Sequence, residues 1–200
     1  YVGVLIPPSV GGVVNNAALT LSQRVAVNLN YTVSSVVMNN CIAQCGIKHV
    51  LTSRQVMKKL DLEIDAELVY LEDFRKKVTK VDKFASAIAG IGMPAGMLAR
   101  RLGIHQFDPE ETFTLIFTSG STGNPKGVML TGKNVASNIQ AIDELVHFSD
   151  DDVMVGILPF FHSMGFTATL WTVLMLKLKG VYHFSPLDAR AVGTLCGDHQ

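Results

Sequence analysis

Cysteine is scarce in this sequence, and the few that are present form no recognisable site. Cys41, Cys45 and Cys196 are an odd set without a CxxC pair or a nearby pair of histidines. The pattern argues against a disulfide framework and a zinc site, and we expect no residue of this chain to bind a metal. Reduced, mostly buried thiols are typical of proteins that work in the cytoplasm, so we expect a cytoplasmic location.

An excess of charge of either sign is also lacking. The 200 residues contain 17 Lys and Arg and 17 Asp and Glu, which gives a formal net charge of zero. Nucleic-acid-binding proteins depend on a basic surface, so we expect no nucleic acid partner. The charge is unevenly distributed, because Arg24 is the one charged residue in 1–47 and the stretch 153–176 has no Asp, Glu, Lys or Arg.

The sequence has no uninterrupted apolar run of membrane-spanning length. Pro7, Pro8 and several asparagines break the first charge-poor stretch, and Pro159, His162 and Gly165 break the second. Interrupted stretches of this kind favour strand–loop–helix units that are buried on several sides over membrane spans. Since no basic segment precedes the first apolar run, no signal peptide is expected.

Strand-like apolar runs alternate with helical patterns along the chain. We expect strands at 2–6, 49–53, 68–72, 112–118, 128–131, 152–158 and 180–184, and helices at 10–28, 32–45, 54–60, 134–147, 163–176 and 187–196. In the second of these helices Thr32 or Ser34 suits the N-cap, and Gly46 suits the C-terminal end. The alternation predicts an α/β fold with a mostly parallel sheet and helices on both faces.

The region 72–106 departs from this alternation. Residues 48–83 are rich in charge and are expected to form a solvated outer layer. Residues 84–104 are apolar, are interrupted by Gly92, Pro94 and Gly96, and close with two arginines. Two interpretations remain open: a docked pair of amphipathic helices, or a membrane-surface contact with the arginines at the lipid headgroups.

The stretch TSGSTGNPKG, residues 118–127, is the least ordinary part of the sequence. It follows the apolar run 113–117 and contains three glycines, four hydroxyl side chains, one proline and one lysine. Glycine permits backbone angles that let consecutive N–H groups turn inward and form a nest for an anion. Lys126 adds a cation that can follow phosphate oxygens, and Pro125 stiffens the end of the loop. The alternative is a flexible surface turn, but the pattern favours polyphosphate binding.

A second stretch imitates a nucleotide loop. Residues 127–134, GVMLTGKN, nearly fit GxxxxGK[ST], but Asn134 stands where the magnesium-binding hydroxyl belongs. The middle of this stretch is apolar and is expected to be strand. We therefore expect Lys133 and Asn134 to begin the next helix instead.

The string IFTSGSTGNPKGVMLT, residues 116–131, resembles the phosphate-loop signature of the adenylate-forming (AMP-binding) superfamily of acyl-CoA synthetases, luciferases and adenylation domains. Residues 157–165, ILPFFHSMG, are similar to the motif that follows this loop in the fatty-acyl members. The segments 25–32, 158–171 and 182–190 look closest to bacterial acyl–acyl-carrier-protein synthetases of the 2-acylglycerophosphoethanolamine acyltransferase type. The resemblance covers nearly the whole chain and is weakest at 72–106.

The resemblance implies an enzyme that joins a fatty acid to ATP, releases pyrophosphate, and passes the acyl group to the thiol of coenzyme A or of a carrier protein's phosphopantetheine. It implies that Lys126 draws charge toward the leaving pyrophosphate. It also implies that His162 is an aromatic gate beside the carboxylate, with Phe161 and Gly165 in the substrate pocket. A core histidine is the alternative for His162. The residues implied to line the β- and γ-phosphates are Thr118, Ser119, Gly120, Ser121, Thr122, Gly123 and Lys126.

The apolar side chains around His162 are also candidates for that pocket. Phe160, Phe161, Met164 and Phe166 suit a fatty chain, although core packing explains them equally well.

By the same resemblance, 1–200 is the N-terminal portion of the large domain. It divides into a first βαβ region (1–71), a charged and apolar helical segment (72–106), and a phosphate-loop and acyl-pocket region (107–200). The C-terminal domain and the Mg²⁺ ligand are then expected outside the chain, and these residues alone should bind ATP weakly and turn over little. Two alternatives stay open: a non-catalytic phosphate- or nucleotide-binding module, and a domain that acts at the inner face of the membrane.

Overall fold

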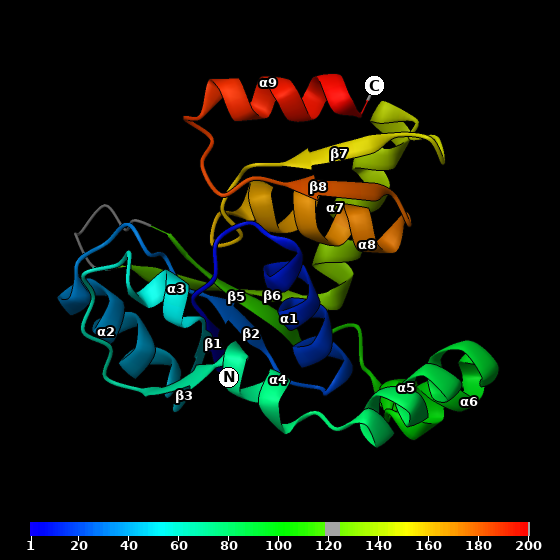
Figure 1. Cartoon of the computed structure of the whole chain (residues 1–200), viewed down its shortest axis with the longest axis horizontal. Coiled ribbons are helices and arrows are strands. Elements are labelled where there is room, and N and C mark those ends of the chain that lie inside the picture. The colour runs from blue at the N-terminus through cyan, green and yellow to red at the C-terminus, as the bar shows by residue number, and fades with distance from the viewer. Residues whose placement is uncertain (119–124, 200) are drawn as a thin grey trace.

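A six-stranded sheet forms the base of the molecule in a computed structural model, which describes residues 1–118 and 125–199 (Figure 1). Its strand order is β4-β3-β1-β2-β5-β6, and all neighbours are parallel except β5 and β6. A separate parallel pair, β7-β8, forms a second sheet. The strands are β1 Val2–Val4, β2 Ala26–Asn28, β3 His49–Thr52, β4 Glu67–Tyr70, β5 Thr112–Thr118, β6 Lys126–Thr131, β7 Val153–Gly156 and β8 Lys179–Tyr182.

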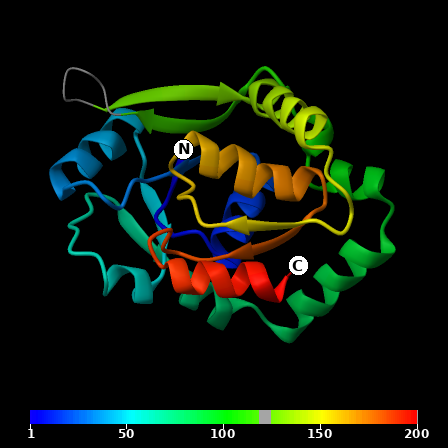
Figure 2. The same ribbon diagram turned by 90° about the horizontal axis from the view of Figure 1, so that it is seen from above.

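Helices and sheets alternate in layers (Figures 1 and 2). Helix α2 covers one face of the large sheet, α1, α7 and α8 lie between the two sheets, and α9 covers the outer face of β7-β8. The helices are α1 Val10–Leu21, α2 Ser35–Cys45, α3 Arg54–Met57, α4 Leu71–Lys77, α5 Lys80–Gly92, α6 Ala95–Arg101, α7 Gly132–Val146, α8 Thr172–Met175 and α9 Ala189–Asp198, with a 3₁₀ turn η1 at Ile104–Gln106 and a π-helix η2 at Gly165–Trp171. The expected α/β fold is confirmed, whereas the division into two sheets was not predicted.

The period of two along β5 distributes its side chains between two cores. Leu115 packs with Val27 and Met38 on the α2 side of the sheet. Ile116 points the other way, into the layer formed by α1, α7 and η2. A strand that is buried on both faces is rich in apolar residues at consecutive positions, as Leu115, Ile116 and Phe117 are in β5.

Local chemistry sets the ends of α2 as the sequence indicates. Of the two candidate caps, Ser34 is the N-cap, because its hydroxyl accepts a hydrogen bond from the Val37 N–H at 3.5 Å. Gly46 ends the helix in the left-handed conformation, at φ 61°. Glycine adopts this conformation without a steric penalty, and it is the common residue there.

The expected helix 10–28 is wrong at residues 22–28. The helix ends at Leu21, Gln23 takes a positive φ of 55°, and Ala26–Asn28 is strand β2, with all three residues buried. A three-residue strand is too short to give a period. Its polar end is paired across the core: Asn28 donates to the Asn16 side chain at 2.8 Å, and Asn16 donates back at 3.1 Å.

The cysteines only partly follow expectation. All three are free, but Cys41 alone is buried, Cys45 is half-buried and Cys196 is exposed. Burial raises the pKa of the Cys41 thiol to about 11.

Residues 84–104 lie mostly in α5 and α6, but these helices do not bury the apolar face that the interpretation as a docked amphipathic pair required. All 13 residues of α5 are described and none is buried, and the same holds for the seven residues of α6. Within the described residues, no helix combines the length and the apolar character needed to cross a membrane.

Candidate functional site at the carboxyl edge of the sheet

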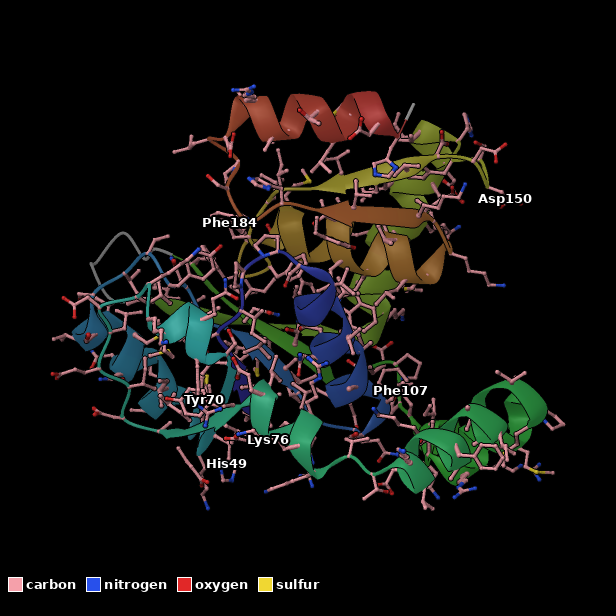
Figure 3. The ribbon with its side chains drawn as sticks, viewed as in Figure 1. His49, Tyr70, Lys76, Phe107, Asp150 and Phe184 are labelled. Atoms are coloured by element: carbon pink, nitrogen blue, oxygen red, sulfur yellow. The ribbon has the colours of Figure 1, made fainter. Side chains whose placement is uncertain are left out.

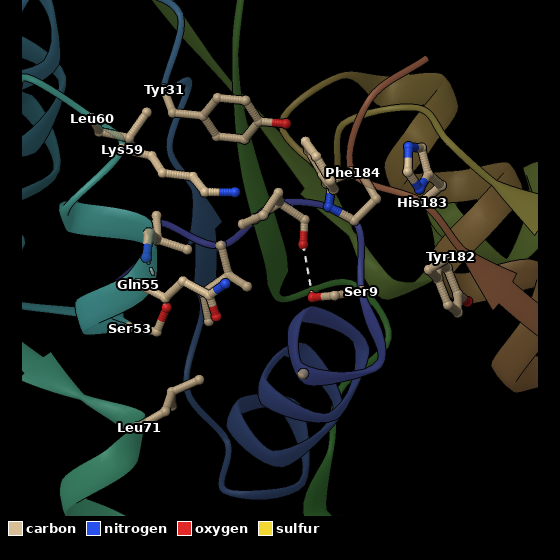
Figure 4. Close-up of a pocket in the computed structure, with 15 residues that line it drawn as sticks. Ser9, Tyr31, Ser53, Gln55, Lys59, Leu60, Leu71, Tyr182, His183 and Phe184 are labelled. Carbon is tan, nitrogen blue, oxygen red and sulfur yellow. Dashed lines mark hydrogen bonds between the residues drawn. The ribbon is translucent and has the colours of Figure 1, made fainter. Parts of the chain in front are cut away.

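A cavity of about 600 Å³ lies at the edge of the large sheet where the parallel strands end (Figure 4). Its walls include the residues that follow four strands: Pro7 after β1, Tyr31 after β2, Ser53 after β3 and Leu71 after β4. The chain runs from β1 to a neighbour on one side and returns to β3 on the other, so β1 is the topological switch point. Ligands of open α/β sheets bind at this place, outside the carboxyl ends of the strands.

The chemistry of the cavity is apolar with a few polar groups. The Lys59 ammonium lies 5.0 Å from the centre of the Phe184 ring, which follows β8 (Figures 3 and 4). Ser9 begins α1 at the cavity wall, where its hydroxyl donates to the Pro7 carbonyl at 2.9 Å and accepts from the Gly12 N–H. Burial raises the pKa of the Tyr31 phenol to about 12, so this group stays protonated at neutral pH. Such a space suits a ligand with an apolar body and an anionic group.

The β5–β6 hairpin carries the described ends of the predicted phosphate loop. Thr118 ends β5 at the same edge of the sheet as the cavity, because β5 runs parallel to β2. Lys126 pairs with Thr118 across the hairpin, and the Thr118 hydroxyl donates to the Lys126 carbonyl at 3.4 Å. Both residues are exposed. The other predicted phosphate ligands, Ser119, Gly120, Ser121, Thr122 and Gly123, lie outside the described residues.

The segment after β7 places His162 beside Phe161, which in turn contacts the cavity residue Tyr31. His162 is exposed, so its interpretation as a core histidine is wrong. Its ring centre lies 4.6 Å from that of Phe161, and Phe161 meets the ring of Tyr31 edge-on at 4.9 Å. Two backbone hydrogen bonds hold this turn: the His162 N–H donates to the Pro159 carbonyl at 3.1 Å, and the Phe166 N–H donates to the His162 carbonyl at 2.8 Å.

Gly165 fixes the conformation behind His162. A Cβ on this buried residue would lie 2.7 Å from the Leu158 carbonyl oxygen and would also collide with the carbonyl of Pro159. The segment 163–176, expected to be an ordinary helix, begins with π-helical turns at Gly165–Trp171. Rare π-helical turns often occur at functional sites.

Two of the phenylalanines expected around an acyl pocket belong to the core instead. Phe160 and Phe166 are each 1% exposed and pack with Val13 and Leu170 between the two sheets. Met164 is exposed. Phe161 meets the cavity residue Tyr31 edge-on, and Phe160 meets the cavity residue Tyr182 from the core side, with ring centres 5.9 Å apart. The positions of these phenylalanines in the sequence were compatible with an acyl pocket and with the core. Packing against Val13 of α1 places Phe160 and Phe166 in the core.

The imitation of a nucleotide loop at 127–134 folds as expected for a strand and a helix start. Thr131 is the N-cap of α7, and its hydroxyl accepts from the Asn134 N–H at 3.2 Å. Asn134 accepts in return from the Thr131 N–H at 3.1 Å, which completes a capping box. Lys133 turns away to bind Glu110 at 2.7 Å.

Sequence reasoning missed Tyr31, Lys59, Tyr182, His183 and Phe184 as cavity residues. They come from three segments that no motif connects, and the strand topology brings them together. The only sequence signal for these cavity residues would have been their position at the end of a parallel strand, or of the short helix that follows one. Within 1–118 and 125–199, no group of three or more His, Cys, Asp and Glu side chains is arranged to hold a metal ion.

Comparison with known sequences places this geometry in context. A family model described as AMP-binding enzyme matches residues 1–199. The 4-coumarate-CoA ligase 1 of Narcissus pseudonarcissus is 28% identical over 174 residues, which cover 84% of this chain and 30% of that protein. The 2-succinylbenzoate–CoA ligase of Bacillus cereus strain Q1 is 28% identical over 171 residues, covering 83% of this chain and 34% of the ligase. The chain thus spans about a third of the length of these relatives.

Solved structures share the fold. The O-succinylbenzoate coenzyme A synthetase of Bacillus subtilis, in complex with ATP and magnesium ion, superimposes with a TM-score of 0.76 at 20% identity, over 99% of this chain and 47% of that one. A malonyl-CoA ligase with methylmalonyl-CoA and AMP bound gives a TM-score of 0.73 at 19% identity, over 99% of this chain and 38% of that one.

Proposed function

We propose, from the premise that this chain belongs to the family of AMP-binding enzymes, that the protein activates a carboxylic acid with ATP and transfers the acyl group to a thiol. In the first step a carboxylate oxygen attacks the α-phosphorus of ATP, and pyrophosphate leaves. In the second step a thiolate attacks the acyl carbon, and AMP leaves. The observation that carries the proposal is the sequence TSGSTGNPKG between β5 and β6, whose described ends, Thr118 and Lys126, pair at the carboxyl edge of the sheet.

Lys126 is the cation we assign to the first step. Its side chain is exposed at the end of the hairpin, and it forms no ion pair with any residue in the described ranges. An ammonium group in this position is free to accompany the negative charge that builds on the leaving pyrophosphate. Preorganised positive charge at such a point lowers the barrier to reaction. The hydroxyl of Thr118, on the facing strand, adds a neutral donor at the same end.

His162 and Phe161 are the groups we assign to the acid and thiol side. The hydrogen-bonded turn presents the exposed imidazole, and the contact of this ring with Phe161 connects it to Tyr31 at the cavity. A flat ring in this position can open or block a route to the reacting carboxylate without changing its protonation state. Gly165 leaves room for the backbone carbonyls of Leu158 and Pro159 in the turn that carries this ring.

The acid we propose is a fatty acid, and the acceptor is coenzyme A or the phosphopantetheine of a carrier protein. Apolar side chains around the cavity and the resemblance of 157–165 to the fatty-acyl motif support this assignment. An aromatic acid is the second candidate, because the relatives named above are ligases of 4-coumarate and 2-succinylbenzoate. Mg²⁺ would neutralise charge on the ATP phosphates when bound.

The test is carboxylate-dependent exchange of pyrophosphate into ATP, measured on the full-length protein with a panel of fatty, aryl and amino acids. We expect exchange that depends on a fatty acid. Lys126→Ala should slow it about a hundredfold or more, since one preorganised electrostatic group is commonly worth that much. Lys133→Ala is the matched control, because Lys133 pairs with Glu110 on the surface and should leave the rate unchanged.

Two results would contradict the proposal. Absence of exchange with every acid, together with measurable ATP binding, would favour the non-catalytic nucleotide-binding module. An unchanged exchange rate in Lys126→Ala would contradict the role of Lys126 in the first step, although the protein would still be a ligase.

A further inference from the structure

The α5–α6 segment, residues 80–101, presents an apolar stripe to solvent. Val81, Phe84, Ile88 and Ile91 recur at spacings of three and four residues, and they are 75%, 70%, 56% and 90% exposed. At 100° per residue these positions fall within about 80° of the helix circumference. Met97 on α6 is 58% exposed as well. Soluble proteins rarely expose a contiguous apolar surface of this kind without a partner.

Positive charge is concentrated beside this stripe. The 27 residues 75–101 hold seven of the 17 Lys and Arg residues of the chain but only Asp82 among its 17 Asp and Glu residues. Lys80, Lys83, Arg100 and Arg101 form no ion pair with any residue of the described part of the chain. The combination of this local positive charge with the exposed apolar stripe suits a partner that is both apolar and negatively charged.

The segment also projects from the layered body. Figures 1 and 2 show α5 and α6 at the end of the molecule opposite the 118/126 end of the β5–β6 hairpin. After the C-terminal end of α6, the side chain of Gln23 donates to the Leu102 carbonyl at 3.4 Å. At the N-terminal end of α5, Thr79 and Asp82 form a capping box that begins the helix. Helix α5 therefore has a regular N-terminus, although its apolar face is exposed to solvent.

We propose that α5–α6 anchors the protein to a membrane surface that carries anionic lipid headgroups. The apolar stripe enters the boundary between headgroups and acyl chains, and the lysines and arginines contact lipid phosphates. An amphipathic helix with a basic polar face lies in the interface plane in this way, and anionic lipid strengthens its binding. The anchor holds the hairpin at the opposite end of the molecule clear of the surface.

The test is flotation of the full-length protein with vesicles of equimolar phosphatidylglycerol and phosphatidylcholine, compared with vesicles of phosphatidylcholine alone. We expect flotation with the anionic vesicles, and a partition at least about fivefold lower with the neutral ones. Raising the salt from about 0.1 M to about 1 M should release the protein, because the screening length falls from about 10 Å to about 3 Å. The assay requires no adenylation, so it stands apart from the ligase proposal.

Two variants locate the contact. Ile88→Glu/Ile91→Glu places charge in the apolar stripe, and Arg100→Glu/Arg101→Glu reverses the charge beside it. Each should lower the vesicle partition about tenfold or more. Leu145→Glu is the matched control: Leu145 is 81% exposed on α7, away from the segment, and its replacement should leave flotation unchanged.

The competing partner is the remainder of the protein's own chain. Ile91→Cys in a Cys196→Ser background, treated with a maleimide without vesicles, distinguishes the two. Rapid labelling that slows when anionic vesicles are added supports the anchor. Slow labelling in their absence means that other parts of the chain cover the stripe, and this overturns the proposal. Flotation that both double variants leave unchanged would overturn it equally.

Discussion

At the scale of single residues, Gly165 matters because it lacks a side chain. The turn that presents His162 requires this absence, because two backbone carbonyls occupy the space of a Cβ. The glycine could be read from the sequence as part of a motif, but the reason for it could not. The contact involves the carbonyls of Leu158 and Pro159, and it exists only after the turn has closed.

We expect Gly165→Ala to destabilise the full-length protein by about 1–3 kcal/mol, the usual cost of overpacking a filled site. The adenylation rate should fall as well, because the segment that holds His162 must shift. Thermal unfolding and pyrophosphate exchange measure the two effects. Gly193→Ala on α9 is the control, since a Cβ there meets no atom within 4 Å. A Gly165→Ala protein with unchanged stability would show that the turn adapts without strain.

At the scale of helices and strands, interactions between neighbouring residues and interactions between distant residues determine different features. The two ends of α2 follow from Ser34 and Gly46 and can be read from the sequence, and the capping boxes that begin α5 and α7 likewise involve side chains only three residues apart. Strand β2 cannot, because its three residues gain their stability from β1 and β5 on either side. Its polar residue, Asn28, is tolerated in the core because it pairs with Asn16 of α1.

The pairing of Asn16 with Asn28 is expected to hold α1 against the sheet. Asn16→Ala or Asn28→Ala leaves a buried amide without its partner, which costs about 1–3 kcal/mol. The double variant should lose less than the sum of the two, by about 0.5 kcal/mol or more, since the two side chains interact directly. Denaturant unfolding of the four proteins measures the coupling. Strictly additive losses would mean that the pair contributes no specific interaction.

Asn15→Ala provides the matched control. Asn15 is the neighbour of Asn16 on α1, but its side chain donates only to the Gly11 carbonyl of the same helix, at 2.6 Å on the exposed side. Its replacement should change the unfolding free energy by less than about 0.5 kcal/mol, as is usual for surface substitutions.

At the scale of the whole molecule, stability is unevenly distributed. The strands β1 and β2 lie inside the six-stranded sheet, with buried residues on both faces, whereas α5 and α6 have none among their described residues. Local opening of a segment requires little free energy when it exposes no buried surface. The two regions should therefore open at very different rates.

Hydrogen exchange of the full-length protein without lipid should show this difference. We expect amides of 80–101 to exchange orders of magnitude faster than those of Ala26–Asn28, because opening costs from near zero up to the global stability. Mass spectrometry of peptides from the two regions measures the rates. Comparable protection in both would contradict an exposed α5–α6 segment.

The sequence by itself determined the phosphate-loop motif, the α/β class, the two ends of α2, and the charged and apolar character of 80–101. Each of these depends on residues within a few positions of one another, through caps, period and backbone freedom. The family followed from a contiguous motif, and the match of a family model over residues 1–199 confirmed it.

Only the tertiary structure decided where β2 begins, that the strands form two sheets, and which phenylalanines face the cavity. It also decided that Tyr31 and Phe161 connect His162 to a space at the switch point of the sheet. These features arise from contacts between residues far apart in the chain. Which face of a short apolar segment is buried depends on the neighbour that the fold brings to it, and no local pattern specifies that neighbour.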